Sequence, residues 1–353
     1  MNQRKIIIDT DPGGDDCFAL LWLMSLAKQG WAKAIAVTTA AGNVGARCTF
    51  TNASKILALG GFDPVEIGRA SKQISDIAGD ESARNAALDD TQDESARDIT
   101  RDIAQDVAKD AAHIHGVDGI GNLAETLPEV PRPFDAARYS DDIIIEKLDA
   151  APGEITLVAI APLTNLAAAE AKSPGILRKA KELVILAGAF QCRGNIATHA
   201  EFNIFSDPEA AEKVLNSRDD IVILPLDITH QLVFTPEMAE SIFQTNPDSD
   251  IAKLIVSLCQ FMTATNLRYR DTDGKNGFLV HDAATLAYLF YPETLLLRRA
   301  RVVVETQGRY SRGQTLFDDR HLPKTTPNAW VALKVDADNL LAILVEDLKL
   351  LIE

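Results

Sequence analysis

The sequence predicts an α/β protein with an open, mostly parallel sheet and helices on both faces, a Rossmann-like core. Short apolar runs at residues 6–8, 155–160 and 221–224 carry this prediction, because none alternates with polar residues. Runs of this kind are typical of strands that are buried on both sides. The first two lead through loops containing Pro into helical patterns, which is the order of consecutive βα units.

The other elements follow from the same patterns. Further apolar runs predict strands at residues 31–39, 65–68 and 183–186. Residues 301–305 and 331–335 predict late strands, and their direction in the sheet stays open. Helices are expected directly after residue 16 and over residues 141–150, 250–268, 283–290 and 337–351. We find no internal repeat, so the expected unit is a single domain over residues 1–353.

The composition restricts the class of partner. The chain has 353 residues, of which 46% are hydrophobic, and a formal net charge of −16. An acidic surface disfavours nucleic acid and anionic membranes, which both require basic faces. The four cysteines are widely spaced and form no CxxC pair, which predicts free thiols. With no signal-like start and no apolar run of membrane-spanning length, we expect a cytoplasmic protein.

One segment differs from the rest in its charge. Residues 76–110 hold eleven acids and four bases, and aspartates recur every four residues at positions 98, 102, 106 and 110. The spacing predicts an exposed amphipathic helix over residues 93–112. We interpret residues 71–112 as an acidic helical insertion, and a solvated surface explains its charge best.

The strongest candidate site follows the first strand. Four carboxylates, Asp9, Asp11, Asp15 and Asp16, lie within eight residues, and the last two open the first helix. Capping would explain one or two of these acids, but not four at the carboxyl end of a strand, where α/β sheets bind ligands. Carboxylates held together repel one another unless a cation or shared protons offset the charge. Oxygen donors suit Ca²⁺ or Mg²⁺ better than zinc.

More polar groups are expected at the same edge of the sheet. Asn43 follows the second strand, and His115 lies in a loop punctuated by glycines. A loop after residue 186 holds Asn195 and the run Glu201, Phe202 and Asn203, and a later loop ends in His281 and Asp282. Loops at this edge commonly carry function, and a His beside an Asp is a usual acid/base arrangement.

Taken together, these motifs resemble the inosine–uridine-preferring nucleoside hydrolase family. The stretch Asp-Thr-Asp-Pro-Gly-Gly-Asp-Asp at residues 9–16 matches the family's acidic hallmark. Further matches, in the family's order, are Gly-Asn at 42–43, Ala-Pro-Leu-Thr-Asn at 161–165, Gly-Asn at 194–195, Ala-Glu-Phe-Asn at 200–203, Asp-Pro-Glu-Ala at 207–210 and Val-His-Asp at 280–282.

The resemblance implies one Ca²⁺ per subunit at the carboxyl edge of the sheet. Its ligands would be the carboxylates of Asp11, Asp16 and Asp282, the carbonyl oxygen of Ile160, water and two ribose hydroxyls. Asp9 would lie behind these ligands and hold them in place. The resemblance also implies a homodimer or homotetramer.

The implied reaction is hydrolysis of the N-glycosidic bond of a ribonucleoside to free base and ribose, as in nucleoside salvage. Asp11 would take a proton from the calcium-bound water, and His281 would assist the leaving base. Carboxylates and amide oxygens suit the positive charge that develops on the ribose ring. Asp15, Asn43, Asn195, Glu201, Phe202 and Asn203 would bind the sugar, and His115 is a candidate contact for the base.

Two alternatives stay open. The pair Asp9 and Asp11 after an apolar strand also suits a phosphatase of the haloacid dehalogenase type, with Asp9 as nucleophile, although this leaves Asp15, Asp16 and residues 201–203 unexplained. A non-catalytic protein that binds calcium and a ribosyl group is the second alternative. The sequence does not indicate the preferred base.

Overall fold

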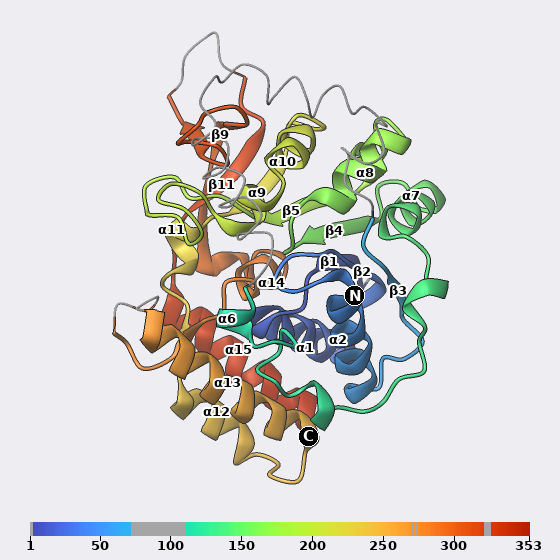
Figure 1. Ribbon diagram of the computed structural model, residues 1–353, viewed down its shortest axis with the longest axis vertical. Helices are drawn as coiled ribbons and strands as arrows, with labels where there is room; N and C mark the ends of the chain where they lie inside the picture. The colour runs from blue at the N-terminus through green and yellow to red at the C-terminus, as the bar shows by residue number, and fades with distance from the viewer. Residues whose placement is uncertain (1–2, 72–110, 270–271, 273, 321–325) are drawn as a thin grey trace, which may run out of the picture.

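The computed structural model describes residues 3–71, 111–269, 272, 274–320 and 326–353. Residues 72–110 of the predicted acidic insertion, and with them most of its predicted helix over residues 93–112, lie outside the described residues. Within them a large sheet separates two layers of helices (Figure 1). The predicted fold class is therefore confirmed.

The described sheet has nine strands. In spatial order the strands are β10 (Thr315–Asp318), β9 (Leu295–Val304), β11 (Ala329–Val335), β6 (Ile221–Leu224), β5 (Glu182–Leu186), β4 (Ile155–Ala159), β1 (Arg4–Thr10), β2 (Ala32–Thr39) and β3 (Glu66–Gly68). All neighbouring strands from β11 to β3 in this order run parallel. β9 pairs antiparallel with both β10 and β11, which settles the direction of the late strands.

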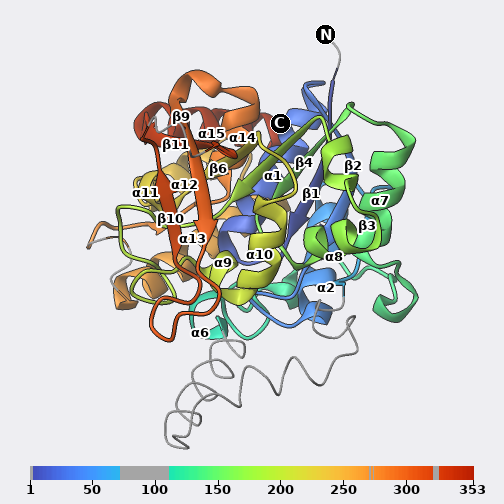
Figure 2. The same ribbon diagram turned by 90° about the horizontal axis from the view of Figure 1, so that it is seen from above.

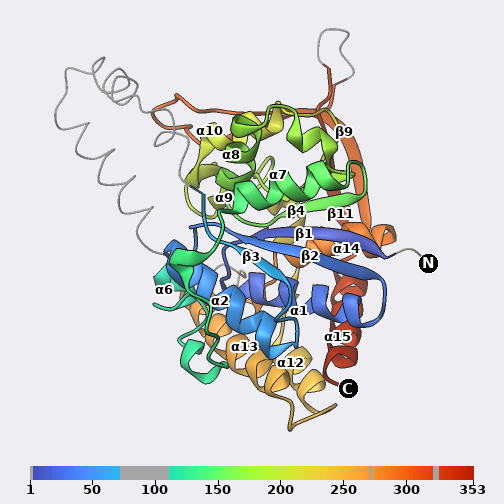
Figure 3. The same cartoon turned by 90° about the vertical axis from the view of Figure 1, so that its right-hand side faces the viewer.

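Each face of the sheet has its own apolar core, and Figure 3 shows the sheet between the two layers. The larger core lies under α1 (Gly14–Lys28), α2 (Ala46–Leu59), α12 (Pro236–Phe243), α13 (Asp250–Tyr269), α14 (Ala283–Phe290) and α15 (Ala337–Ile352). The other core lies under α7 (Ser140–Ala150), α8 (Thr164–Lys172), α9 (Phe202–Ser206) and α10 (Pro208–Leu215).

Several short elements have no clear signal in the sequence. These are α6 (Ala112–His115), α11 (Leu226–Thr229), the strand pair β7 (Val233–Phe234) and β8 (Phe278–Leu279), and the 3₁₀ turns η1 (Ala124–Thr126), η2 (Phe134–Ala136), η3 (Ile176–Lys179) and η4 (Pro292–Thr294). α6 includes His115, which the sequence predicted in a loop punctuated by glycines. In Figure 2 the hairpin between β9 and β10 extends toward α9 and α10.

The four cysteines are free thiols, as predicted. Within the described parts of the chain, no helix has the length and apolar character needed to cross a membrane.

α1 is the central helix of the larger core. Twelve of its fifteen residues are buried, so it has no solvent-facing stripe. Near its carboxyl end, Trp22 Nε1 and the Tyr291 hydroxyl donate to one oxygen of Asp347, at 2.7 and 2.6 Å. The Asp347 carboxylate, which is 5% exposed, therefore ties α1 to α15 through buried hydrogen bonds.

We expect the substitution Asp347→Ala to lower the free energy of unfolding by roughly 3 kcal/mol, because it leaves the buried Trp22 indole N–H and the partly buried Tyr291 hydroxyl without this acceptor. Urea denaturation measures this change. Glu346→Ala is the matched control on the same helix, since the Glu346 side chain is 70% exposed and its ion pair with Lys349 contributes little. A loss for Asp347→Ala no larger than that of the control would contradict this account.

Candidate active site

The first turn of α1 holds the centre of the acid cluster. The Asp16 carboxylate accepts four hydrogen bonds, from Thr10 Oγ1 at 2.6 Å, Gly13 N and Asn43 Nδ2 at 3.0 Å, and Asp11 N at 3.2 Å. These bonds fold the loop after β1 around a single side chain. A helix N-terminus also favours negative charge.

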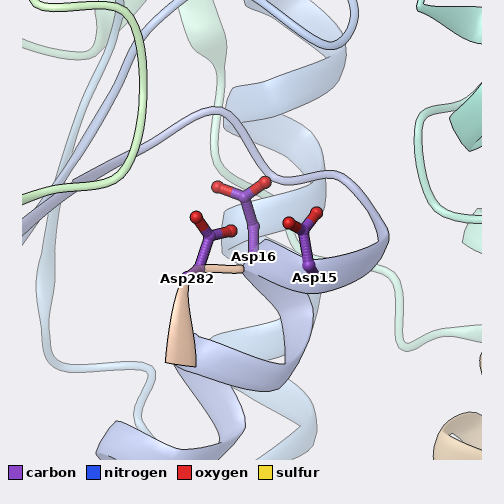
Figure 4. A group of neighbouring side chains, drawn as sticks. All are labelled: Asp15, Asp16 and Asp282. Atoms are coloured by element: carbon purple, nitrogen blue, oxygen red, sulfur yellow. The ribbon is translucent and has the colours of Figure 1, made fainter. Parts of the chain in front are cut away.

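Three carboxylates converge beside this turn. Asp15, Asp16 and Asp282 each place an oxygen within 4.8 Å of the others. Figure 4 shows Asp15 and Asp16 at the start of α1, with Asp282 on the neighbouring segment and all three carboxylates directed to the same side. Asp282 precedes α14, so the two helices that contribute acids begin next to each other. The sequence predicted Asp15 as a sugar contact, and the structure places its carboxylate beside those of Asp16 and Asp282, which were predicted as metal ligands.

Asp11 lies beside these three carboxylates and is closely packed. Its side chain is 1% exposed, and its Oδ2 accepts a hydrogen bond of 2.7 Å from the backbone of Asn43. Asn43 Nδ2 in turn donates to the Asp11 carbonyl and to Asp16. A Cβ atom on Gly42 would lie 2.0 Å from Asp11 Oδ2, so only glycine allows this approach.

Burial and mutual repulsion disfavour the ionised form of these acids. Burial raises the pKa of Asp15 to about 8, with a further contribution from the charge of Asp16. Burial also raises the pKa values of Asp11 and Asp282, and every neighbouring charge that adds to these shifts is another carboxylate. A group of buried acids without a compensating base requires protons or a cation.

The donor chemistry of the cluster fits a hard cation. The converging oxygens of Asp15, Asp16 and Asp282 form the kind of oxygen-rich set that Ca²⁺ and Mg²⁺ bind, whereas Asp11, also predicted as a ligand, lies outside this group of three. The carbonyl of Ile160, the predicted backbone ligand, accepts a hydrogen bond of 3.0 Å from Asn203 Nδ2. The cluster can therefore hold a metal ion, with Asn203 orienting the Ile160 carbonyl.

Glu201 and Asn203 lie at the start of α9. The Glu201 carboxylate caps this helix by accepting from Asn203 N and Ile204 N, and it also accepts from Gly188 N. Burial raises the pKa of Glu201 to about 7, although these backbone donors oppose the shift. Asn203 Nδ2 also donates to the Leu186 carbonyl. Both side chains thus connect α9 to the ends of β4 and β5.

Asn195 and Phe202 are more open. Asn195 is exposed, and its Oδ1 accepts a hydrogen bond of 2.8 Å from Phe202 N. This bond fixes the loop before α9. The ring of Phe202 is half-buried.

Asp9 is fully buried beneath these groups. Its Oδ1 accepts from Thr38 Oγ1 at 2.6 Å and from Asn165 Nδ2 at 2.7 Å, whereas its Oδ2 has no hydrogen-bond partner among the described residues. Burial raises the pKa of Asp9 to about 7. The carboxyl group joins β1 to β2 and α8 from behind the cluster.

Two histidines, His115 and His281, lie next to the residues of the acid cluster. His281 Nδ1 lies 2.7 Å from Thr229 Oγ1, and burial lowers the pKa of His281 to about 3. His115 Nδ1 accepts from Gly14 N at 3.0 Å, and burial lowers its pKa to about 4. Both rings are therefore neutral near pH 7. His115, predicted as a base contact, already has a structural partner at the start of α1.

Sequence reasoning missed three contributors. Thr10 and Asn165 lie inside the quoted motifs, so their position next to aspartates was a usable signal. Thr229 lies 52 residues from its partner His281, and nothing in the local sequence marks it. Only the fold brings these two side chains together.

Comparison with known proteins identifies the family. The family model described as inosine-uridine preferring nucleoside hydrolase matches residues 6–342. This chain belongs to that family. It is 30% identical to the inosine-uridine preferring nucleoside hydrolase of Leishmania major over 349 residues, covering 98% of each chain. It is also 30% identical to uridine nucleosidase 1 of Arabidopsis thaliana, covering 93% of this chain and 86% of the relative.

Solved structures agree with this assignment. A plant nucleoside hydrolase, the PpNRh1 enzyme, superposes with a TM-score of 0.79 at 30% identity and covers 98% of this chain and 99% of its own. The chain is therefore an enzyme, a nucleoside hydrolase that cleaves the N-glycosidic bond of ribonucleosides. The phosphatase and the non-catalytic alternatives are not supported.

Proposed function

We propose that this nucleoside hydrolase uses one Ca²⁺ per subunit, held by Asp11, Asp16, Asp282 and the Ile160 carbonyl, with Asp15 close enough to contribute. The observation that carries the proposal is the convergence of Asp15 with the buried Asp16 and Asp282, in surroundings whose neighbouring charges are also acidic. When bound, the cation would offset this charge and polarise both water and ribose hydroxyls.

Asp11 is the proposed general base. In the reaction the bond between the ribose anomeric carbon and the base nitrogen breaks, and a water oxygen bonds to that carbon. Asn43 N occupies Asp11 Oδ2, which leaves Oδ1 to accept the water proton. The acids around the sugar, Asp15 and Glu201, would stabilise the positive charge that develops on the ribose ring.

His281 is the proposed donor to the leaving base. Thr229 occupies Nδ1, so the Nε2 atom is the one available to the substrate. Because burial holds the pKa of His281 at about 3, we infer that the ring acts near neutral pH as a neutral Nε2–H donor and not as an imidazolium. Asn43, Asn195, Phe202 and Asn203 are the remaining proposed ribose contacts, and His115 the proposed base contact.

The base preference and the assembly are also proposals. The names of the two relatives mention uridine and inosine, so these two ribonucleosides are the first substrates we expect. A homodimer or homotetramer in the cytoplasm, taking part in purine and pyrimidine salvage, stays a prediction.

The test is a panel of ribonucleosides assayed in parallel for free base and for reducing ribose. We expect equal release of both products from uridine or inosine. A parallel assay of phosphate release from a phosphomonoester tests the phosphatase alternative. Binding of nucleoside without any release, or release of phosphate alone, would refute the proposed function.

A further inference from the structure

The turn after β5, residues 187–191, is held by side chains from other segments of the chain. Each of its five consecutive backbone N–H groups has an acceptor, and four of these acceptors are side-chain oxygens from other segments. The donors and acceptors are Ala187 to the Leu224 carbonyl at 3.3 Å, Gly188 to Glu201 Oε2 at 3.1 Å, Ala189 to Thr315 Oγ1 at 3.1 Å, Phe190 to Asp227 Oδ2 at 2.9 Å and Gln191 to Asp227 Oδ1 at 2.7 Å.

Two of the side chains come from elements remote in sequence. Asp227, in α11, accepts from two adjacent N–H groups, one at each carboxylate oxygen. Thr315, the first residue of β10, accepts from Ala189 N and donates to the Ala189 carbonyl at 3.1 Å. Gly188 has φ +87°, a conformation in which a side chain is strained, and its carbonyl accepts from Leu226 N. We call residues 187–191 with Asp227 and Thr315 the clamped turn.

One hydrogen bond joins the clamped turn to Glu201, a proposed ribose contact. Gly188 N donates to the Glu201 carboxylate, which also caps α9 and so fixes the position of Asn203. A shift of the turn therefore moves Glu201. We propose that Asp227 and Thr315 are positioning residues for ribose recognition, acting through the clamped turn on Glu201. This inference rests on the proposed role of Glu201 as a ribose contact.

The clamped turn is partly exposed, so a substitution there can change its geometry without unfolding the protein. Gln191 is exposed, and Asp227 and Phe190 are only partly buried. If the Asp227 carboxylate is removed, water can hydrate the freed N–H groups, so the fold is retained while the turn loses its fixed geometry. Charge-assisted bonds to a carboxylate are the stronger class of hydrogen bond, so the geometric effect is expected to be large.

Steady-state kinetics with a ribonucleoside and its 2′-deoxy and 3′-deoxy analogues test the inference. For Asp227→Ala we expect KM to rise about 10-fold with kcat changed less than about 3-fold, as for a loss of ground-state and transition-state binding together. The preference for the ribonucleoside over at least one deoxy analogue should fall by a similar factor. Asp227→Asn, which keeps one acceptor oxygen, should show an intermediate KM, and Thr315→Val should change KM in the same direction.

Asp336→Ala is the matched control. Asp336 also accepts a backbone N–H, from Asn339 at the start of α15, and within the described parts of the chain no hydrogen bond joins it to the clamped turn. We expect wild-type kinetics for this variant. Wild-type KM and selectivity in both Asp227→Ala and Thr315→Val would overturn the inference, as would an equal loss on all three substrates that follows a loss of thermal stability. If the wild-type enzyme itself released no ribose, the proposed function would fail first, and the two failures are distinguishable.

Discussion

Asp11→Asn is expected to lower kcat for ribonucleoside hydrolysis by about 10³-fold, which is within the usual contribution of a general base. The amide retains the shape of the side chain and can still accept the hydrogen bond from Asn43 N, but it cannot take a proton from water. Initial rates at saturating uridine or inosine measure the effect.

The control for this substitution is Asp149→Asn. Asp149 forms an exposed ion pair with Lys179, so removing its charge should leave kcat and the fold unchanged. Circular dichroism should show the same secondary structure for both variants. A kcat for Asp11→Asn within 10-fold of the wild type would exclude Asp11 as the base.

The second large effect concerns stability, pH and the cation. Burial raises the pKa values of Asp9 and Glu201 to about 7 and of Asp15 to about 8. In the unfolded chain these groups ionise near pH 4, so the metal-free folded state binds more protons than the unfolded state between about pH 4 and pH 8. The metal-free protein should therefore lose stability as pH rises through this window, by about 1.4 kcal/mol per pH unit for each carboxyl group that stays protonated.

Calcium should weaken this dependence, because a cation binds the ionised carboxylates that converge in the folded state, whereas Asp9 and Glu201 are not among its proposed ligands. Thermal unfolding from pH 5.5 to 8.5, in chelator and in millimolar calcium, measures both effects. We expect Tm in chelator to fall as pH rises, and the difference in Tm that calcium produces to be largest at pH 8.5. Superimposable curves with and without calcium would contradict the proposed cation site.

The fold was predictable where a strand or helix has its own apolar pattern. The runs at residues 6–8, 155–160 and 221–224 correspond to strands buried on both sides, and the helix expected after residue 16 is α1. The pair β7 and β8 was not predictable, because each strand has two residues and pairs with a segment more than 40 residues away. Local patterns carry no information about such pairings.

The candidate site was predictable as a set of residue types, but not as a set of contacts. The acid cluster at residues 9–16 and the pair at 281–282 follow from motifs, and the structure brings Asp15, Asp16 and Asp282 together. The sequence could not indicate that Asp15 groups with Asp282, or that Glu201 caps α9 and holds Gly188. These contacts depend on how loops from separate strands meet, which no spacing along the chain specifies. The assigned roles of the individual site residues stay predictions.

The most direct test of the cation site is a titration of calcium into metal-free enzyme, followed by hydrolysis rate and by bound metal in the same samples. The account predicts that activity is absent without metal, rises in proportion to bound calcium and saturates at one ion per chain. It also predicts that Asp282→Asn binds calcium more weakly and needs more of it for the same activity. Full hydrolysis by enzyme shown to contain no metal would contradict the account.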